Sequence, residues 1–560
     1  MRGVAVRGYA PFRLLSSSSW LLCAVLCAGI IAVPVATIAV YVFVPAGPVW
    51  SHLVDTVLAD YVINSLALMV GVTLGAGVIG VSTAWITAMY TFPGRRLFEW
   101  ALLLPLAIPT YIIAYIYTDL LEVAGPVQQG IRSLFNLQYG EYYFPDVRSL
   151  GGAILVFSLV LYPYVYLTSR AAFLSQSICV LEVSRTLGCS PFRSFFSVAL
   201  PLARPAIMVG LSLTLMETLA DFGAVDYFGV STFTTGIYRT WFGLNNDAAA
   251  AQLAAVMMLF IFALLLLERW SRFKAKFHHA SGRYQSIPEL HLKGGKGLLA
   301  LLVCSLPLGL GFLLPFVQLC RWAVSTWREM VDSAFLSLVT NSLMLAAVTA
   351  LVALVPALLL AYAQRLYPVR TLRFAARFAG MGYAIPGSVI AVGVLIPFGM
   401  LDNFVDGVVQ SRFGFSTGLI FSGTVFILIF AYTVRFLAVS LQSVESGLGG
   451  IHASMDQAAL SMGKAPLGVL KAVHLPMMKG TLLTAVLLVF VDVLKELPAT
   501  MILRPFNFNT LAVRVHELAS DERLADSSTA AIAIVLVGLV PVIMLSKTIA
   551  RSRPGQHEPT

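Results

Sequence analysis

The chain has 560 residues, of which 58% are hydrophobic and only 11% are charged, and its formal net charge is +10. Because a soluble domain carries about 25% charged residues, this composition excludes a globular protein with a fully solvated surface. Lys and Arg gather in short loops beside apolar segments, which is how membrane topology is encoded. They do not form the basic face with stacking groups that nucleic-acid binding needs, so no nucleic-acid partner is expected.

Runs of about 20 apolar residues recur along the chain, and each can cross a hydrocarbon core of about 30 Å as a helix. The strands of a membrane β-barrel would instead alternate over about 10 residues. The sequence therefore predicts an all-α polytopic membrane protein of about twelve transmembrane helices, embedded in a lipid bilayer. The expected spans are 20–44, 61–90, 97–121, 150–174, 205–227, 249–268, 297–319, 336–364, 375–400, 418–440, 480–503 and 529–547.

The second half of the chain repeats the first. Asn64-Ser65 recurs as Asn341-Ser342, and Ala107-Ile108-Pro109 recurs as Ala384-Ile385-Pro386, 277 positions later in both cases. Two six-span halves in the same orientation are related by a pseudo-two-fold axis along the membrane normal, and such an axis creates a central pathway. We therefore expect a parallel repeat with a first six-span domain over 1–275, a basic cytoplasmic linker over 276–296 and a second domain over 297–560.

The distribution of basic residues predicts the orientation. If the N-terminus lies in the cytoplasm, the even-numbered loops are cytoplasmic, and these loops hold most of the Lys and Arg, including Arg95, Arg365 and the linker. Both termini are then expected in the cytoplasm.

Two of the predicted cytoplasmic loops carry similar sequences. The first reads EVSRTLG over 182–188 and the second reads QAALSMG over 457–463, and each continues into an amphipathic run that closes at Leu-Pro. Helical spacing of the apolar residues in that run predicts a short helix. One such helix could simply lie on lipid headgroups, but two copies at a fixed offset favour a docking surface for another protein. His452 and His474, in the second loop, are expected at the surface.

These loops resemble the EAA loop of binding-protein-dependent ABC importer permeases, which reads Glu-Ala-Ala, three residues, Gly, and later Leu-Pro. The first copy has Val183-Ser184 in place of the two alanines, and the second has Gln457 in place of the glutamate. In that family the loop forms a coupling helix that sits in a cleft of an ATPase subunit. The resemblance implies two fused permease domains and assigns this coupling role to Glu182, Gly188, Phe192, Phe195, Leu200, Pro201, Gln457, Ala458, Ala459, Gly463, Leu467, Leu475 and Pro476.

The flanking segments are similar to ferric-iron importer permeases. The similarity lies in ETLADFG at 217–223, TTGIY at 234–238, KELPAT at 495–500 and RPFNF at 504–508. It implies a permease of the bacterial inner membrane that works by alternating access on ferric iron delivered by a periplasmic binding protein. Two cytoplasmic ATPase subunits would supply the energy from ATP and Mg²⁺.

Other functions stay open at this stage. Related fused permeases for thiamine or aminoethylphosphonate share the architecture, and an ion-gradient-driven secondary transporter can also have twelve spans and repeats. The chain has no Gly-x-x-x-x-Gly-Lys-Ser/Thr phosphate loop. We therefore expect a transport subunit that is not itself an enzyme and binds no cofactor.

The repeat also pairs acidic residues inside the fifth and eleventh spans. Glu217 corresponds to Asp492 and Asp221 to Glu496, and the four-residue spacing in each half predicts one shared helical face. Carboxylates at this depth are costly unless they face a bundle interior or a water-filled cavity. We expect them to line a substrate pathway, since hard oxygen ligands suit ferric iron. Asp221 and Glu496 are candidate transient ligands, and no firm metal site is expected.

Two alternatives explain the same carboxylates. Lys495 could neutralise Asp492 in a structural pair, or the carboxylates could contact the external binding protein.

Overall fold

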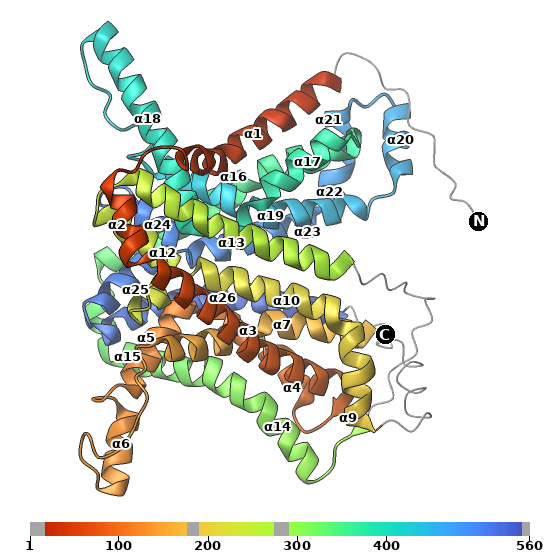
Figure 1. The fold of residues 1–560 in the computed structure, drawn as a ribbon. Helices are drawn as coiled ribbons and strands as arrows, with labels where there is room; N and C mark the ends of the chain where they lie inside the picture. The colour runs from red at the N-terminus through yellow and green to blue at the C-terminus, as the bar shows by residue number, and fades with distance from the viewer. Residues whose placement is uncertain (1–16, 176–189, 274–289, 552–560) are drawn as a thin grey trace.

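The computed structural model describes residues 17–175, 190–273 and 290–551. In these ranges ten helices are long and apolar enough to cross a membrane, or twelve if each of two bent helix pairs counts as one span. The predicted all-α polytopic fold is therefore confirmed (Figure 1).

The first-half helices follow the predicted spans, with additional short helices between them. They are α1 (Ser17–Tyr41), α2 (Pro48–Thr56), α3 (Leu58–Met89), α4 (Arg95–Ala101), η1 (Leu104–Ala107), α5 (Thr110–Leu121), α6 (Pro126–Phe135), α7 (Leu150–Ser175), α9 (Pro191–Ser194), η2 (Phe195–Ala199), α10 (Leu200–Ala220), α11 (Gly223–Tyr227), α12 (Phe233–Phe242) and α13 (Asp247–Phe273).

The second half shows a similar order of elements. They are α14 (Gly295–Leu308), η3 (Gly309–Leu313), α15 (Leu314–Met330), α16 (Ser333–Leu366), α17 (Arg370–Ala379), η4 (Gly380–Ala384), α18 (Gly387–Phe413), α19 (Val425–Gly449), α20 (Ala453–Ser461), α21 (Pro466–Val469), η5 (Leu470–His474), α22 (Leu475–Met477), α23 (Lys479–Leu494), α24 (Pro498–Leu503), α25 (Leu511–Ser520) and α26 (Leu524–Arg551). Two-residue strands β1 (Tyr90–Thr91) and β2 (Leu290–His291) pair in parallel.

The repeated Ala-Ile-Pro motif interrupts the third and ninth predicted spans. A 3₁₀ turn (η1 or η4) precedes each proline, and Pro109 and Pro386 have extended ψ values of 143° and 146°. Proline has no N–H to continue a helix and its ring clashes with the preceding turn, so a new helix begins at the next residue. In the first half the two segments meet at 91°. The expectation of continuous helices over 97–121 and 375–400 was wrong for this reason.

The repeated asparagines make equivalent contacts. Asn64 Nδ2 donates to the carbonyl of Ser231 at 3.0 Å, and Asn341 Nδ2 donates to the carbonyl of Asn509 at 3.3 Å. Each bond ties the second span of a half to the loop after its fifth span. The internal repeat of the sequence is thus also a repeat of specific polar contacts.

The two halves exchange their first and last spans. α1 packs with α16, α17 and α18 of the second half and α13 packs with α18, whereas α14, α15 and α26 share a core with α3, α5 and α7 of the first. At Gly393 on α18 an added Cβ would lie 2.5 Å from the carbonyl oxygen of Pro34 on α1, so these two helices approach backbone to backbone. The division into domains at 275 and 297 remains a prediction, and each hydrophobic core contains helices from both sides of it.

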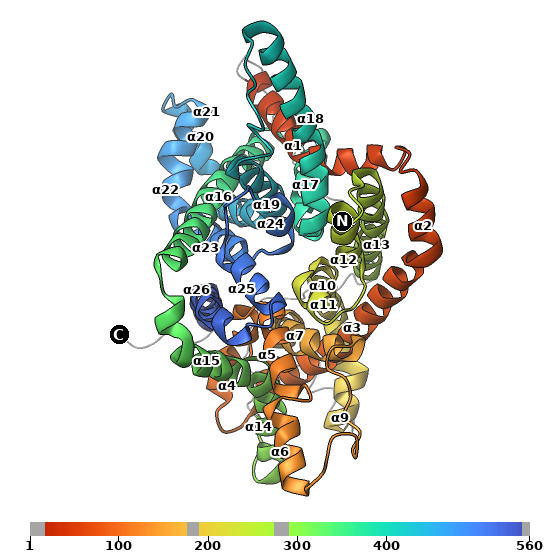
Figure 2. The same cartoon turned by 90° about the vertical axis from the view of Figure 1, so that its left-hand side faces the viewer.

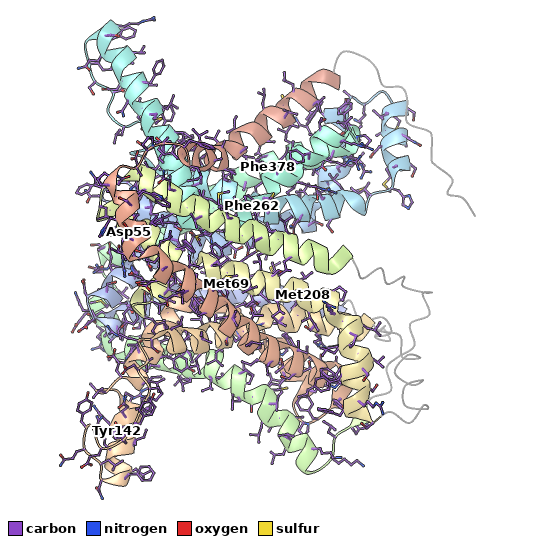
Figure 3. All side chains as sticks on the ribbon, viewed as in Figure 1. Asp55, Met69, Tyr142, Met208, Phe262 and Phe378 are labelled. Atoms are coloured by element: carbon purple, nitrogen blue, oxygen red, sulfur yellow. The ribbon has the colours of Figure 1, made fainter. Side chains whose placement is uncertain are left out.

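The two ends of the bundle differ. α9 and the helices α20 to α22 lie at the right-hand end of Figure 1, and Figures 1 and 2 both place them on opposite sides of the bundle. α6 and the far end of α18 project at the other end. Tyr142 lies beside α6 in Figure 3, where its hydroxyl donates to Gln128 Oε1 at 2.7 Å.

Candidate functional site

The four predicted carboxylates converge on one cavity between the two halves. The cavity has a volume of about 100 Å³ and is lined from α5, α7 and α10 of the first half and from η4, α19 and α23 of the second. Its polar lining residues are Thr110, Tyr111, Tyr164, Glu217, Asp221, Tyr383, Arg435, Asp492, Lys495 and Glu496. The convergence that the repeat predicted is therefore present.

The carboxylates reach the cavity in a way that the sequence spacing did not predict. Glu217 and Asp492 lie within α10 and α23, whereas Asp221 and Glu496 lie just beyond the ends of those helices. Asp221 Oδ1 accepts the backbone N–H three residues further on at 2.8 Å, and Glu496 Oε1 accepts its equivalent at 3.0 Å. The expected shared helical face was wrong, because the second carboxylate of each pair leaves its helix and binds the backbone at the start of α11 or α24.

Both cations of the cavity belong to the second half. Lys495 Nζ lies 2.9 Å from Asp492 Oδ1, so the anticipated pair is present. Arg435 Nη1 lies 3.0 Å from Glu496 Oε1, and this side-chain pair is nearly buried. Arg435 was missed, although it is the only charged residue of the predicted span 418–440 and a charge at such a position marks a functional site.

The first-half carboxylates face a different environment. Val160, which lies 275 positions before Arg435 in the sequence, lines the same cavity and supplies no charge. Glu217 Oε1 accepts hydroxyl groups from Tyr164 at 3.5 Å and from Tyr383 at 3.4 Å. Across the lining residues four carboxylates face two cations, which leaves a formal charge of −2. This excess negative charge lies on the first-half side.

Three tyrosines, none of them predicted, complete the polar lining. Tyr164 and Tyr383 come from different halves and meet at Glu217. Tyr111 is only 4% exposed, and its hydroxyl has no hydrogen-bond partner within the described structure. Tyr111 and Tyr383 lie close to the repeated Ala-Ile-Pro motif, so a polar side chain beside a break in an apolar span was the signal available in the sequence.

The first predicted coupling segment is described in part, since Glu182 and Gly188 lie outside the described residues. Phe192 is 74% exposed, and its ring contacts the exposed ring of Phe196 at 4.7 Å between centroids. Phe195 instead turns inward and contacts Trp85 at 4.9 Å. Of the remaining predicted residues on this segment, Leu200 is half-buried and Pro201 is exposed.

The second predicted coupling segment forms a turn between α20 and α21. Gly463 has φ +80°, a conformation that glycine adopts without the strain of a side chain. The chain then bends by 79° between the segments that end at Met477 and begin at Lys479. Of the predicted residues here, the exposed ones are Gln457, Ala458, Gly463, Leu467 and Pro476, while Leu475 is half-buried and Ala459 is buried.

The prediction that His474 lies at the surface was wrong. Its side chain is fully buried, and Nε2 lies 2.6 Å from Asp456 Oδ1. The other oxygen of Asp456 accepts the Arg365 Nε–H at 2.8 Å, and the Tyr362 hydroxyl donates to the carbonyl of Pro466 at 2.6 Å. The imidazole is buried because η5 presents it to Asp456 on α20 and to the ring of Tyr362 on α16, at 5.3 Å between ring centroids. His452 is exposed as expected.

Comparison with known proteins identifies the class of molecule. Residues 76–275 match the family of binding-protein-dependent transport system inner membrane components. The chain is 28% identical over 495 residues to the Fe(3+)-transport system permease protein FbpB 2 of Haemophilus influenzae, covering 88% of this chain and 90% of that protein. It is 23% identical over 469 residues to the ferric transport system permease protein FbpB of Actinobacillus pleuropneumoniae, covering 79% and 64%.

A shorter relative matches part of the chain. The molybdenum transport system permease protein ModB of Escherichia coli is 25% identical over 222 residues, which cover 39% of this chain and 92% of that protein. Together with the apolar helices, these matches identify a multi-pass inner-membrane protein that is a component of a transport system.

Proposed function

Since residues 76–275 match the family of binding-protein-dependent transport system inner membrane components and most of the chain is similar to a ferric permease, we propose that it forms the membrane path of an ATP-driven importer for ferric iron. A periplasmic binding protein delivers the ion, and two separate cytoplasmic ATPase subunits drive the permease through alternating access. The chain itself binds no ATP. The permease provides the membrane path, and the shape of this path changes during transport.

The observation that carries this proposal is the cavity between the halves. Its formal charge of −2, from four carboxylates and two cations, favours a cation, because like charges at short range in a medium of low dielectric repel strongly. The relatives include permeases named for ferric iron and for molybdenum transport, so the charge of the cavity bears on which of these two cargoes the chain carries. An oxyanion such as molybdate would have to pass an excess of negative charge.

The size of the cavity argues against an organic cargo such as thiamine. Pockets for drug-sized ligands have volumes of about 300–1,000 Å³, whereas this cavity has about 100 Å³. One buried water needs roughly 10–15 Å³, so the space suits a metal ion with a few waters.

The helices suggest how force reaches the cavity. In the first half α9, η2 and α10 follow one another without a gap from Pro191 to Ala220, and Asp221 comes next. In the second half η5, α22 and α23 lead from the exposed Leu467 region to Glu496 across the bend at Met478. An ATPase subunit that moves α9 or α21 therefore moves a helix that carries cavity carboxylates.

The two coupling segments are suitably placed for two ATPase subunits. They lie at the same end of the bundle and on opposite sides of it (Figures 1 and 2). We assign this end to the cytoplasm, in agreement with the distribution of basic residues. The exposed Phe192, Phe196 and Leu467 would then be covered by the ATPase subunits, and not by lipid headgroups.

Uptake into vesicles tests the proposal. The permease is reconstituted with its ATPase and binding protein, and ferric and molybdate uptake are measured for wild type and for Glu217→Gln with Asp221→Asn, whose carboxylates form no ion pair within the described residues. We expect ATP-dependent ferric uptake that the double substitution lowers without changing the amount of permease in the membrane. Molybdate uptake by the wild type, or ferric uptake unchanged by the double substitution, would contradict it.

A further inference from the structure

Glu217 and the tyrosines around it form an oxygen-donor cluster that the transport proposal does not yet use. Tyr164 Oη and Tyr383 Oη lie 3.5 and 3.4 Å from the same carboxylate oxygen, Glu217 Oε1. Both contacts are long for O–H···O hydrogen bonds, which are usually 2.5–3.0 Å. Glu496 is held more closely, by a guanidinium and a backbone N–H at 3.0 Å each. Glu217 is thus the carboxylate whose partners leave it most available to a ligand.

Tyr111 supplies an independent sign of a missing partner. Its side chain is 4% exposed, it lines the cavity, and its hydroxyl makes no hydrogen bond within the described residues. A buried hydroxyl without a partner costs free energy, so an unpaired one in a native cavity needs an explanation. The Tyr111 hydroxyl also lies within electrostatic range of Asp221 and Glu496. It therefore lies in the acidic part of the cavity.

We propose that Glu217, Tyr164 and Tyr383 form a transient coordination site for ferric iron on the path through the membrane. Tyr111 is a further donor on the side of Asp221. The proposal rests on the proposed function and adds the ligands. Carboxylate and phenolate oxygens are hard donors that suit a small trivalent cation. Each phenol that binds the ion as a phenolate releases one proton to water. The negative charge of the phenolate then compensates part of the positive charge of the ion.

The arrangement fits a site that must also release its ion. In the described residues no group of three or more His, Cys, Asp or Glu side chains could hold a metal, so a tight carboxylate cage is not formed there. Two of the four donors, Tyr164 and Tyr383, come from opposite halves, on α7 and η4. A movement of one half relative to the other would separate them, which breaks the site as the pathway changes its access.

The two cations of the second half indicate which carboxylates are not available to the ion. Lys495 and Arg435 pair with Asp492 and Glu496, so these two carboxylates are already neutralised. The ion is therefore placed at Glu217, which forms no ion pair within the described residues, although Lys495 acts on it at longer range. This placement revises the sequence-based suggestion that Glu496 is a ligand.

The test is a titration of the purified full-length permease with ferric nitrilotriacetate. Phenolate bound to ferric iron gives a visible charge-transfer absorption, which reports coordination without transport. We expect this absorption in the wild type, a weaker one in Tyr111→Phe, and none in Tyr164→Phe with Tyr383→Phe. The double variant should also bind ferric iron at least about tenfold more weakly.

Tyr162→Phe is the matched control. Tyr162 is also on α7, is fully buried and has a hydroxyl without a partner among the described residues, but it does not line the cavity. This variant should therefore keep the wild-type absorption. An equal thermal midpoint for all variants shows that they are folded. Absence of the absorption in the wild type, or its persistence in the Tyr164 and Tyr383 double variant, would overturn the site. If wild-type vesicles still accumulate ferric iron in that case, the transport function stands and only the coordination site fails.

Discussion

The ion pair between Arg435 and Glu496 gives the sharpest prediction for stability. The two side chains are 10% and 5% exposed, with 3.0 Å between Arg435 Nη1 and Glu496 Oε1. Arg435→Met removes the cation, leaves a buried carboxylate without a charge partner, and changes the formal charge of the cavity from −2 to about −3. Breaking a buried pair in this way costs about 3–5 kcal/mol, which we expect as the loss in the free energy of unfolding.

Reversible unfolding in mixed micelles measures this loss, with the thermal midpoint in detergent as a second readout. Adding Glu496→Gln removes the stranded charge, so Arg435→Met with Glu496→Gln should recover most of the stability. Arg514→Met is the control, because its 3.8 Å pair with Glu517 is long and partly exposed, with side chains 41% and 28% exposed, and surface pairs contribute about 0–1 kcal/mol. The reasoning is refuted if Arg435→Met costs less than about 1 kcal/mol, or if the double variant is as unstable as the single one.

Three further predictions follow from other parts of the chain. Gly463→Val places a β-branched residue at φ +80°, which should cost about 1–2 kcal/mol and reduce substrate-stimulated ATP hydrolysis; unchanged hydrolysis by the assembled transporter would count against coupling through this turn. Asp456→Asn weakens the contacts to His474 and Arg365 and should increase proteolysis at 450–478, measured against wild type, whereas equal proteolysis would show that the network does not hold the segment. Burial lowers the pKa of His516 from 6.5 to about 4, and its Nδ1 lies 2.7 Å from the Tyr115 hydroxyl. The folded protein therefore favours the neutral ring, so stability is complete above about pH 6.5 and falls by up to about 3 kcal/mol towards pH 4; a pH profile of the thermal midpoint that is identical in His516→Gln would contradict this.

The fold class and the repeat could be predicted because both produce patterns of neighbouring residues in the sequence. Apolar runs identify helices directly, and the Asn64 and Asn341 motifs occupy equivalent positions that make equivalent bonds. The convergence of the carboxylates followed from the same repeat, in which Glu217 and Asp221 correspond to Asp492 and Glu496. These features depend on periodicity and spacing, which a single sequence contains.

Long-range packing could not be predicted in the same way. No local signal shows that α1 and α26 each pack against the opposite half, because an apolar helix surface can be covered by lipid or by any other helix. His474 looked exposed because the residues that it contacts, Asp456 and Tyr362, are 18 and 112 positions away in the sequence. The helix breaks at Pro109 and Pro386 could not have been predicted from proline alone, because Pro34, Pro163 and Pro356 lie inside continuous helices.

The proposed function depends most directly on whether work done by a separate ATPase changes the pathway between the halves. Vesicles that contain the permease, its ATPase and its binding protein can be assayed for ferric accumulation and ATP hydrolysis, in wild type and in Gly188→Glu with Gly463→Glu. We predict uphill ferric uptake only with the ATPase and ATP present, and loss of both activities in the double variant. Uphill uptake by the permease without the ATPase, or full uptake by the double variant, would contradict the account.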